Sequence, residues 1–368
     1  MREPKIDLQR WMGECLALAK KGTGRVSPNP MVGAILVGKG RVLARGYHRS
    51  FGGPHAEATC LDRFSGNPSG ATLYVNLEPC AHHGKTPPCT DRIIRSGIRQ
   101  VVIGMEDPNP LVAGRGIRAL RRAGIRTTVG VLEDECRDFN RLFIHHITKR
   151  LPFVHLKLAQ SLDGKIAGVT RADRWISSVE SRRLVHSWRA SHDAVLVGAG
   201  TVSADNPRLN VRLVSGRDPA VIVIDGQLSL SQNSQLFQSA KERRIFLCTG
   251  TQAIKKRTST IRQMENRGVQ VLKFPDTKGR ISLSAILRRA YENGIASILI
   301  EGGSNIAGGF FCAGLVDQLS LFIAPRVLGK GVPAFHHYVH QRRRHSRKVE
   351  RVITNQLGPD LLVQYFFR

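Results

Sequence analysis

The chain has 368 residues, 36 glycines and an apolar share of 41%, which exclude a disordered protein and predict two α/β domains of roughly 150 to 200 residues. No run reaches the ~18 apolar residues of a membrane helix and the first residues lack the apolar core of a secretion signal, so we expect a cytoplasmic protein. The formal net charge of +28 favours phosphorylated substrates and nucleic acids alike and does not distinguish between them.

The first 150 residues alternate helices and strands. Apolar residues at helical spacing predict a first helix over residues 8–20, and apolar runs at 31–37 and 42–45 predict a hairpin. Further strands are expected at 72–77, 100–105 and 126–131, and further helices at 91–95, 117–123 and 133–146. Asn29 precedes the hairpin, and on residue type alone we interpret it as a turn-forming asparagine rather than a substrate contact. The alternation predicts a mixed sheet with helices on both faces.

The stretch from Pro79 to Cys89 (PCAHHGKTPPC), together with His55 and Glu57 upstream, has the residue types of a hydrolytic zinc site. Such a site needs three ligands, an open fourth position for water and a separate carboxylate that moves protons. We therefore expect His55, Cys80 and Cys89 to bind Zn²⁺ and Glu57 to be the catalytic base. Zinc deaminases place two residues between the cysteines of their general motif. This chain has eight, which requires a wider loop and is compatible with Cys80 at a helix start.

Two other interpretations fit the same residues. The cysteines and the histidine can be two buried thiols and a surface imidazole, or they can form a closed structural zinc site. A structural site has no use for Glu57, which favours the catalytic interpretation. His82 and His83 as further ligands would close the fourth position. Pro54 at a first helical position puts His55 and Glu57 at the beginning of a helix. The remaining cysteines, in a chain with seven, suit a reducing compartment rather than a disulfide scaffold.

A short charged stretch that ends in proline (KRLP, 149–152) predicts the domain boundary, so the expected domains are 1–148 and 149–368. In the second domain, helices are expected at 178–191 and 282–293. Strands are expected at 153–158, 194–197, 220–224, 244–248, 269–273, 297–301 and 318–324. This alternation predicts a largely parallel sheet with ligands at the carboxyl ends of its strands.

Three segments of the second domain have residue types that suit a ligand or a plain turn. The turn at 300–310 (IEGGSNIAGGF) joins a strand to a helix, where backbone amides meet a phosphate or the glycines serve helix packing. The spacing of its glycines differs from G-x-G-x-x-G, the dinucleotide-binding fingerprint of the Rossmann fold, and so excludes that interpretation. Residues 201–209 (TVSADNPRL) offer a hydroxyl, a carboxylate and an arginine, or a capping turn. The basic stretch 341–348 (QRRRHSRK) has no interleaved aromatic residues, so we interpret it as a solvated loop.

Four blocks in the first domain resemble a known family. SPNPMVG, GYHRSFGGPHAE, EPCAHHGKTPPC and DPNPLVAGRG occur in this order over about residues 8–147. They resemble the pyrimidine deaminase half of the bifunctional deaminase-reductase of bacterial riboflavin biosynthesis, and the wide cysteine spacing is the pattern of that family. The resemblance implies a cytidine-deaminase-like fold, with His55, Cys80 and Cys89 binding zinc and Glu57 as the proton shuttle.

The second domain is similar to the reductase half of the same family, whose fold is like that of dihydrofolate reductase. The matching blocks, over about residues 150–330, are KLAQSLDGKIA, WISS, WRASHDAVLVGAGTVSADNPRL, IEGGSNIAGGF and IAPRVLG. The resemblance implies NADPH contacts from Ala159, Trp175, Thr201, Asp205, Gly303, Ser304, Asn305, Ile306, Ala307, Gly308 and Gly309. It implies substrate contacts from Asp173, Arg189, Leu209, Arg212 and Glu301. The chain departs from the family pattern at Asp173, Arg174 and Gly226.

The resemblance implies two successive reactions on a small phosphorylated pyrimidine. The first is zinc-dependent hydrolytic deamination of 2,5-diamino-6-ribosylamino-4(3H)-pyrimidinone 5′-phosphate. The second is NADPH-dependent reduction of the ribosyl group to the ribityl group. The resemblance does not assign the proton donor of this step, for which Asp205 and Lys157 are both candidates. A nucleic-acid deaminase is the rival hypothesis, but it leaves the second domain without a role. We expect no nucleic-acid partner and no membrane association, and the sequence leaves a homo-oligomer open.

Overall fold

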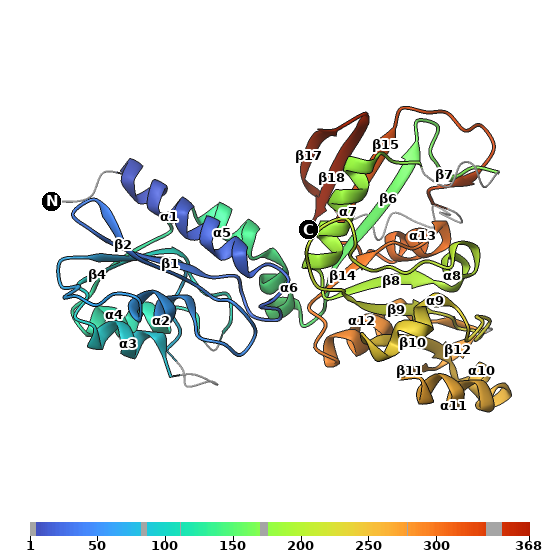
Figure 1. Cartoon of the computed structure of the whole chain (residues 1–368), viewed down its shortest axis with the longest axis horizontal. Helices are drawn as coiled ribbons and strands as arrows, with labels where there is room; N and C mark the ends of the chain where they lie inside the picture. Colours follow the sequence, from blue (N-terminus) through green and yellow to red (C-terminus); the bar gives the residue numbers. More distant parts are fainter. Residues whose placement is uncertain (1–4, 82–86, 111, 170–175, 278, 336–347) are drawn as a thin grey trace. The chain divides into compact units, whose positions relative to one another are not determined.

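The computed structural model describes residues 5–81, 87–110, 112–169, 176–277, 279–335 and 348–368 (Figure 1). The chain divides into two compact units, Met1–Arg150 and Leu151–Arg368, at a point close to the predicted boundary after residue 148. Each unit has its own sheet and is described by itself. Within the described ranges, no helix combines the length and the apolar character that crossing a membrane requires.

The first unit is built on a five-stranded sheet in the order β2-β1-β3-β4-β5. The strands are β1 Gly33–Gly38, β2 Arg41–Tyr47, β3 Thr72–Leu77, β4 Gln100–Met105 and β5 Arg126–Val129. β1 runs antiparallel to both β2 and β3, whereas β3, β4 and β5 are mutually parallel. The prediction of a mixed sheet is confirmed. Because β3 and β4 are parallel neighbours, their carboxyl ends lie at the same edge of the sheet, where the candidate site lies.

Helices cover both faces of this sheet (Figure 1). α1 and α5 lie on one face, and α2, α3 and α4 lie on the other. The helices are α1 Lys5–Ala19, α2 Ala56–Leu61, α3 Cys89–Arg95, α4 Arg115–Arg122, α5 Glu133–Phe139 and α6 Arg141–Lys149, with a 3₁₀ turn at Lys20–Gly22. The single helix predicted over 133–146 is wrong, since the chain breaks at Asn140. The buried Asn140 side chain accepts a hydrogen bond from Met31 N at 2.8 Å and donates one to Met31 O at 3.1 Å.

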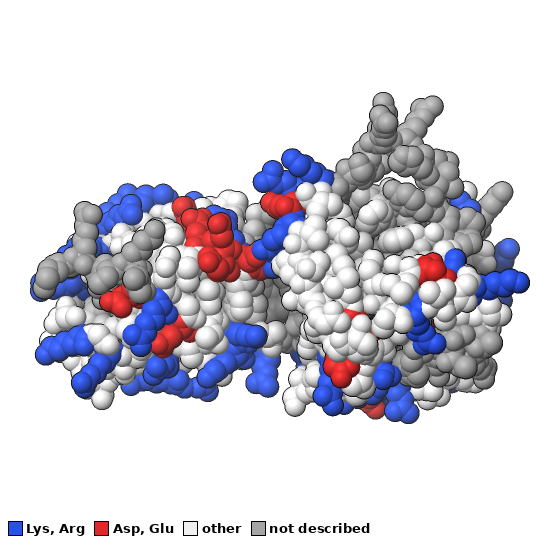
Figure 2. Space-filling view, turned by 90° about the horizontal axis from the view of Figure 1, so that it is seen from above, with Lys and Arg blue, Asp and Glu red and all other residues white. Residues whose placement is uncertain are grey.

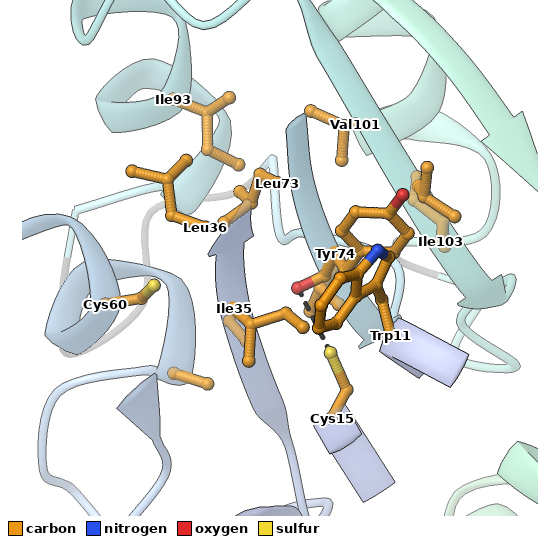
Figure 3. Packing of buried hydrophobic residues seen from close by; sticks show 14 of the residues in the cluster. Trp11, Cys15, Ile35, Leu36, Cys60, Leu73, Tyr74, Ile93, Val101 and Ile103 are labelled. Carbon is orange, nitrogen blue, oxygen red and sulfur yellow. Dashed lines mark hydrogen bonds between the residues drawn. The ribbon is translucent and has the colours of Figure 1, made fainter. Parts of the chain in front are cut away.

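The sheet is buried on both faces, and Figure 3 shows part of the packing. All six residues of β3 are buried. Successive residues of a strand point to opposite faces, so Ile35 and Leu36 of β1 each enter a different side of the core. Trp11 and Cys15 of α1 pack beside Tyr74 of β3, and the Cys15 thiol donates to Tyr74 O at 3.4 Å. The two-sided core holds the strand ends that carry the candidate site.

A glycine in β2 allows helix α2 to pack directly on the strand. A Cβ at Gly46 would lie 2.3 Å from Ala56 O and 2.4 Å from Cys60 N. Gly46→Ala is therefore expected to lower the free energy of unfolding by about 1–3 kcal/mol, because α2 must move away from the sheet. Chemical denaturation measures the change. Gly70→Ala is the matched control, since a Cβ there meets nothing within 4 Å, and equal stability of the two variants would contradict the expectation.

The second unit is built on a nine-stranded sheet in the order β11-β10-β9-β8-β14-β6-β15-β18-β17. Its strands are β6 Phe153–Ser161, β8 Ala194–Gly198, β9 Ala220–Ile224, β10 Ile245–Gly250, β11 Val269–Phe274, β14 Ser297–Ile300, β15 Gln318–Ala324, β17 Val349–Leu357 and β18 Asp360–Phe367. Seven of the nine strands, from β11 to β15 in the sheet order, are parallel to their neighbours, which confirms the predicted largely parallel sheet. Two short antiparallel pairs accompany it: β7 Lys165–Ala167 with β16 Val332–Pro333, and β12 Asp276–Thr277 with β13 Arg280–Ile281.

The described helices of this unit are α7 Val179–Ser191, α8 Ala199–Asp205, α9 Gln235–Gln238, α10 Thr251–Lys256, α11 Thr258–Asn266, α12 Leu283–Glu292 and α13 Ser304–Cys312, with a 3₁₀ turn at Ser239–Lys241. Both predicted helices are confirmed, and each begins at a serine cap. Ser178 Oγ accepts from Ser181 N, and Ser282 Oγ accepts from Ala285 N. The antiparallel hairpin of β17 and β18 was not predicted. Most of β17 is exposed, so its residues lack the continuous apolar run that marks the buried parallel strands.

Candidate functional site

The three expected metal ligands lie together in the first unit. His55 Nδ1 is 3.2 Å from Cys89 Sγ and 3.6 Å from Cys80 Sγ, and Cys89 N donates to Cys80 Sγ at 3.4 Å. The ligand atoms of all three residues lie within 4.8 Å of one another. One imidazole nitrogen and two sulfurs are a donor set that suits zinc, and three protein ligands leave a fourth position open for water. These residues therefore fit a catalytic zinc ion.

The starts of two helices and the loop after a strand hold the ligands. His55 has extended backbone and directly precedes α2. Cys80 lies in the loop that follows β3, and Cys89 is the first residue of α3. A helix start at Cys80, which the sequence allowed, is not observed. The helix begins at Cys89, and Pro88 favours this start because the residue before a proline is biased away from helical backbone. His82 and His83 lie outside the described residues.

Hydrogen bonding within the cluster favours the thiolate at Cys80 and the thiol at Cys89, because the hydrogen bond with Cys80 and burial raise the pKa of Cys89. A hydrogen bond from the Cys89 thiol is the main cause that lowers the pKa of Cys80 to about 4. The hydrogen bond with Cys80 in turn raises the pKa of His55. A thiolate is the form of cysteine that binds metal, so one ligand is ionised at neutral pH even before an ion adds its own charge.

Glu57 lies in the first turn of α2, two residues after His55, and its side chain is buried. Burial is the main cause that raises the pKa of Glu57, and the charge on Cys80 adds to it, whereas His55 acts in the opposite direction. A raised pKa brings the titration of a carboxyl group closer to neutrality, which suits an acid-base catalyst. The structure places this group in the wall of a pocket that also contains His55 and Cys80.

This pocket has a volume of about 350 Å³ and is formed by five segments of the first unit. Asn29 lines the pocket, although the sequence favoured a turn-forming role for this residue over contact with a substrate. Asn29 Nδ2 is 3.2 Å from His48 Nε2, and His48 Nδ1 is 3.0 Å from Pro54 O. Since a carbonyl only accepts, Nδ1 carries the ring proton and Nε2 accepts from Asn29. Burial lowers the pKa of His48, so the ring is neutral and fixed in one tautomer.

Sequence reasoning missed five other polar residues of the pocket wall, namely His48, Glu78, Asp107, Asn109 and His146. Burial is the main cause that raises the pKa of Asp107 to about 6. Asp107 and Asn109 belong to the block DPNPLVAGRG, whose cluster of proline, asparagine and glycine was the available signal for a functional loop. His146 comes from α6, which lies outside all the motifs, and no pattern in the sequence pointed to it.

In the second unit, an ion pair joins two of the expected substrate contacts. Arg189 of α7 donates to Glu301 through Nε at 2.5 Å and through Nη2 at 2.8 Å, and both side chains are about one-tenth exposed. Arg189 Nη1 also donates to Asn210 O at 3.0 Å. Arg212 is held nearby, since its backbone N donates to His186 Nδ1 at 3.1 Å. Although burial acts against ionisation, Arg189 lowers the pKa of Glu301, which stays charged.

The expected cofactor residues cluster around the start of α13. Thr201 Oγ1 accepts a hydrogen bond from Gly303 N at 3.0 Å, which joins α8 to this helix start. Ser304 Oγ is buried and, within the described part of the chain, has no hydrogen-bond partner, as expected for a group that a ligand completes. The other expected contacts in the same region are Asp205 at the end of α8, and Asn305, Ile306, Ala307, Gly308 and Gly309 in α13. The residues present therefore fit a dinucleotide phosphate.

The remaining expected residues of the second unit are placed as follows. Ala159 lies in β6, and Leu209 is buried with a positive φ of 51°. Asp173 and Trp175 lie outside the described residues. At Gly226, a Cβ would lie 1.8 Å from Gly279 O. This close approach of the β12–β13 turn explains why the chain has glycine where the family pattern has a larger residue.

Two family models match the chain. The model of the RibD C-terminal domain matches residues 152–363, and that of the cytidine and deoxycytidylate deaminase zinc-binding region matches residues 5–105. Riboflavin biosynthesis protein RibD of Aquifex aeolicus is 40% identical over 361 residues, which is 98% of each chain. RibD of Actinobacillus pleuropneumoniae is 42% identical over 87% of this chain and 84% of its own length.

Solved structures agree over the whole length. A diaminohydroxyphosphoribosylaminopyrimidine deaminase/5-amino-6-(5-phosphoribosylamino)uracil reductase from Thermotoga maritima is 38% identical, with a TM-score of 0.85 and coverage of 99% of both chains. RibD of Acinetobacter baumannii is 30% identical, with a TM-score of 0.86 and coverage of 99% of this chain and all of the other. The predicted cytidine-deaminase-like and dihydrofolate-reductase-like folds are confirmed by these matches.

Proposed function

Since this chain belongs to the RibD family of bifunctional riboflavin-biosynthesis enzymes, we propose that its first unit deaminates a pyrimidine phosphate and its second unit reduces the product. The chain is a zinc-dependent deaminase joined to an NADPH-dependent reductase. The observation that carries the proposal for the first unit is the cluster of His55, Cys80 and Cys89 beside the buried Glu57 in one pocket. The proposed substrate is 2,5-diamino-6-ribosylamino-4(3H)-pyrimidinone 5′-phosphate.

In the first reaction, His55, Cys80 and Cys89 hold the zinc ion. When bound, zinc activates the water that replaces the amino group of the pyrimidine. Glu57 accepts the proton that the water loses and donates a proton to the leaving amine, so that water and amine become carbonyl and ammonia. The neutral His48 and its partner Asn29 line the same pocket and offer polar groups that orient the ring.

In the second reaction, Arg189 and Arg212 bind the ribose phosphate, because guanidinium groups match phosphate oxygens. Glu301 fixes the orientation of Arg189. When bound next to the start of α13, NADPH supplies a hydride to the open form of the sugar. The sugar oxygen then takes up a proton. Burial lowers the pKa of Lys157, which favours Lys157 over Asp205 as the proton donor.

The charge of the chain supports a phosphorylated small molecule as the partner. Figure 2 shows lysine and arginine side chains dispersed over the visible face with acidic groups between them, rather than in one continuous stripe. A stripe is the usual footprint of a nucleic-acid site. The basic stretch 341–348 lies outside the described residues except for Lys348, and its interpretation as a solvated loop stays a prediction. Oligomeric state and a cytoplasmic location also stay predictions.

The proposed function is tested by giving the full chain the diaminopyrimidinone phosphate with and without NADPH, and following ammonia and NADPH absorbance. We expect ammonia release without NADPH, and NADPH consumption only after deamination. Removal of zinc by a chelator is expected to abolish ammonia release while the reductase still consumes NADPH on the deaminated substrate, because the ligands belong to the first unit alone. Undiminished ammonia release from the zinc-free chain would refute the role of the cluster.

A further inference from the structure

Glu78 is a buried acidic residue that the proposed reactions do not use. It follows β3, stands two residues before Cys80 and is 3% exposed. Within the described part of the chain, its hydrogen-bond partners are backbone amides. Oε2 accepts from Asp107 N at 3.1 Å and from Gly114 N at 2.9 Å, and Oε1 accepts from Ile117 N at 3.0 Å. Both carboxylate oxygens are thus occupied by the chain itself.

The three amides come from one segment, residues 106–117, which leads from β4 into α4. This segment supplies Asp107, Asn109 and Val112 to the pocket wall. Its own backbone hydrogen bonds are local, such as Val112 N to Asn109 O at 2.8 Å. The bonds to Glu78 tie both ends of the segment to β3. Ile117 N lies in the first turn of α4, where an amide has no partner within the helix and where negative charge is favoured.

Close backbone packing brings the segment against the metal-binding loop. Gly114 has a φ of 70°, which glycine adopts without strain. A Cβ at Gly116 would lie 2.0 Å from Pro79 O, so the segment rests on the backbone between Glu78 and Cys80. The loop that carries a metal ligand and the loop that forms the pocket wall are therefore joined at Glu78.

We propose that Glu78 is a positioning residue of the deaminase. By accepting the three amides, it holds the wall that carries Asp107 and Asn109 at the distance from the metal cluster that the pyrimidine ring requires. The inference rests on the proposed deaminase function. Glu78 also lines the pocket, and the inference assigns it the role of holding the wall through its three amide bonds rather than of acting on the reacting atoms.

The test is Glu78→Gln in the full, zinc-loaded chain. Glutamine has the same size but presents an NH₂ group to at least one backbone N–H. At least one of the three hydrogen bonds that hold the wall is therefore lost. We expect KM for the pyrimidine to rise about tenfold or more while kcat falls less than about threefold, because the wall binds the substrate but does not carry the proton. Zinc content and the reductase rate on the deaminated substrate are expected to equal those of the wild type. Ammonia release, metal analysis and NADPH absorbance give the three readouts.

Three further variants separate positioning from other roles. Gly116→Ala pushes the same wall away while Glu78 stays intact, and it is expected to raise KM in the same way. Asp193→Asn is the matched control in the second unit. Asp193 is also buried and accepts from Ala296 N at 3.0 Å and Ser297 N at 3.1 Å, so its replacement is expected to leave KM for deamination within about twofold of the wild type. Glu78→Asp keeps the charge and is expected to give a KM between those of the wild type and Glu78→Gln.

The outcomes distinguish the inference from the function on which it rests. An unchanged KM in Glu78→Gln overturns the positioning role, as does a loss of zinc, which would mean that Glu78 supports Cys80 instead of the wall. An unchanged KM in Gly116→Ala overturns it too, since the wall position would then not govern binding. A wild-type chain that binds zinc but releases no ammonia overturns the proposed function, and the inference falls with it.

Discussion

Glu57→Gln is expected to reduce ammonia release by about 10²–10⁴-fold while zinc stays bound, because glutamine fills the same space but cannot transfer a proton. Glu57 is buried in the pocket beside His55 and Cys80 and has a raised pKa. The three ligands are unchanged in the variant, so metal content is expected to equal that of the wild type. Steady-state ammonia release and metal analysis on the same sample measure both quantities.

Glu133→Gln is the matched control for this prediction. Glu133 also lies in the first turn of a helix, α5, but its side chain is 43% exposed and pairs with Arg137. Its replacement is expected to leave ammonia release unchanged. If Glu57→Gln with full zinc content still turned over at the wild-type rate, Glu57 would not be the proton shuttle, and another group of the pocket would have that role.

Arg189→Ala is expected to lower the free energy of unfolding of the second unit by about 3–5 kcal/mol, because it leaves the Glu301 carboxylate buried without its partner. Both side chains are about one-tenth exposed and two hydrogen bonds join them. The variant also removes a proposed phosphate contact, so kcat/KM of the reductase is expected to fall about 10- to 100-fold, the equivalent of a lost charge-assisted hydrogen bond. Denaturant unfolding and NADPH oxidation measure the two effects.

The control for Arg189 is the partly exposed ion pair in the same unit. Arg217 pairs with Asp193 at 2.9 Å, but the arginine side chain is 45% exposed. Arg217→Ala is expected to cost at most about 1 kcal/mol, since water screens such a pair. Equal destabilisation by the two variants would show that burial of the Arg189–Glu301 pair does not govern its strength. Ammonia release in the same samples checks that the first unit is intact.

The sequence predicted the buried strands well because their signal is local. β3, β4, β9 and β15 have the predicted bounds, and each is a short apolar run between turn residues. The break between α5 and α6 was out of reach, since it depends on hydrogen bonds between Asn140 and Met31, more than a hundred residues apart. β17 was missed because an exposed edge strand has no apolar pattern that distinguishes it from a loop.

The same distinction between local and distant signals applies to the candidate site. Spacing and residue type brought together His55, Cys80 and Cys89, since the chemistry of zinc restricts its ligands to few residue types. Spacing and residue type did not identify His146 and Asp107 as pocket residues. Helix α6 and the segment held by Glu78 bring these residues to the pocket, and only the folded chain shows which residues a helix or loop presents there.

Each sheet is assembled from strands of a single unit, with β1 to β5 in the first unit and the strands from β6 to β18 in the second, and each unit has separate core clusters. A cut between residues 150 and 151 therefore severs no strand pairing. For the gene, this means that recombination at that point leaves every strand of each sheet on the same side of the joint.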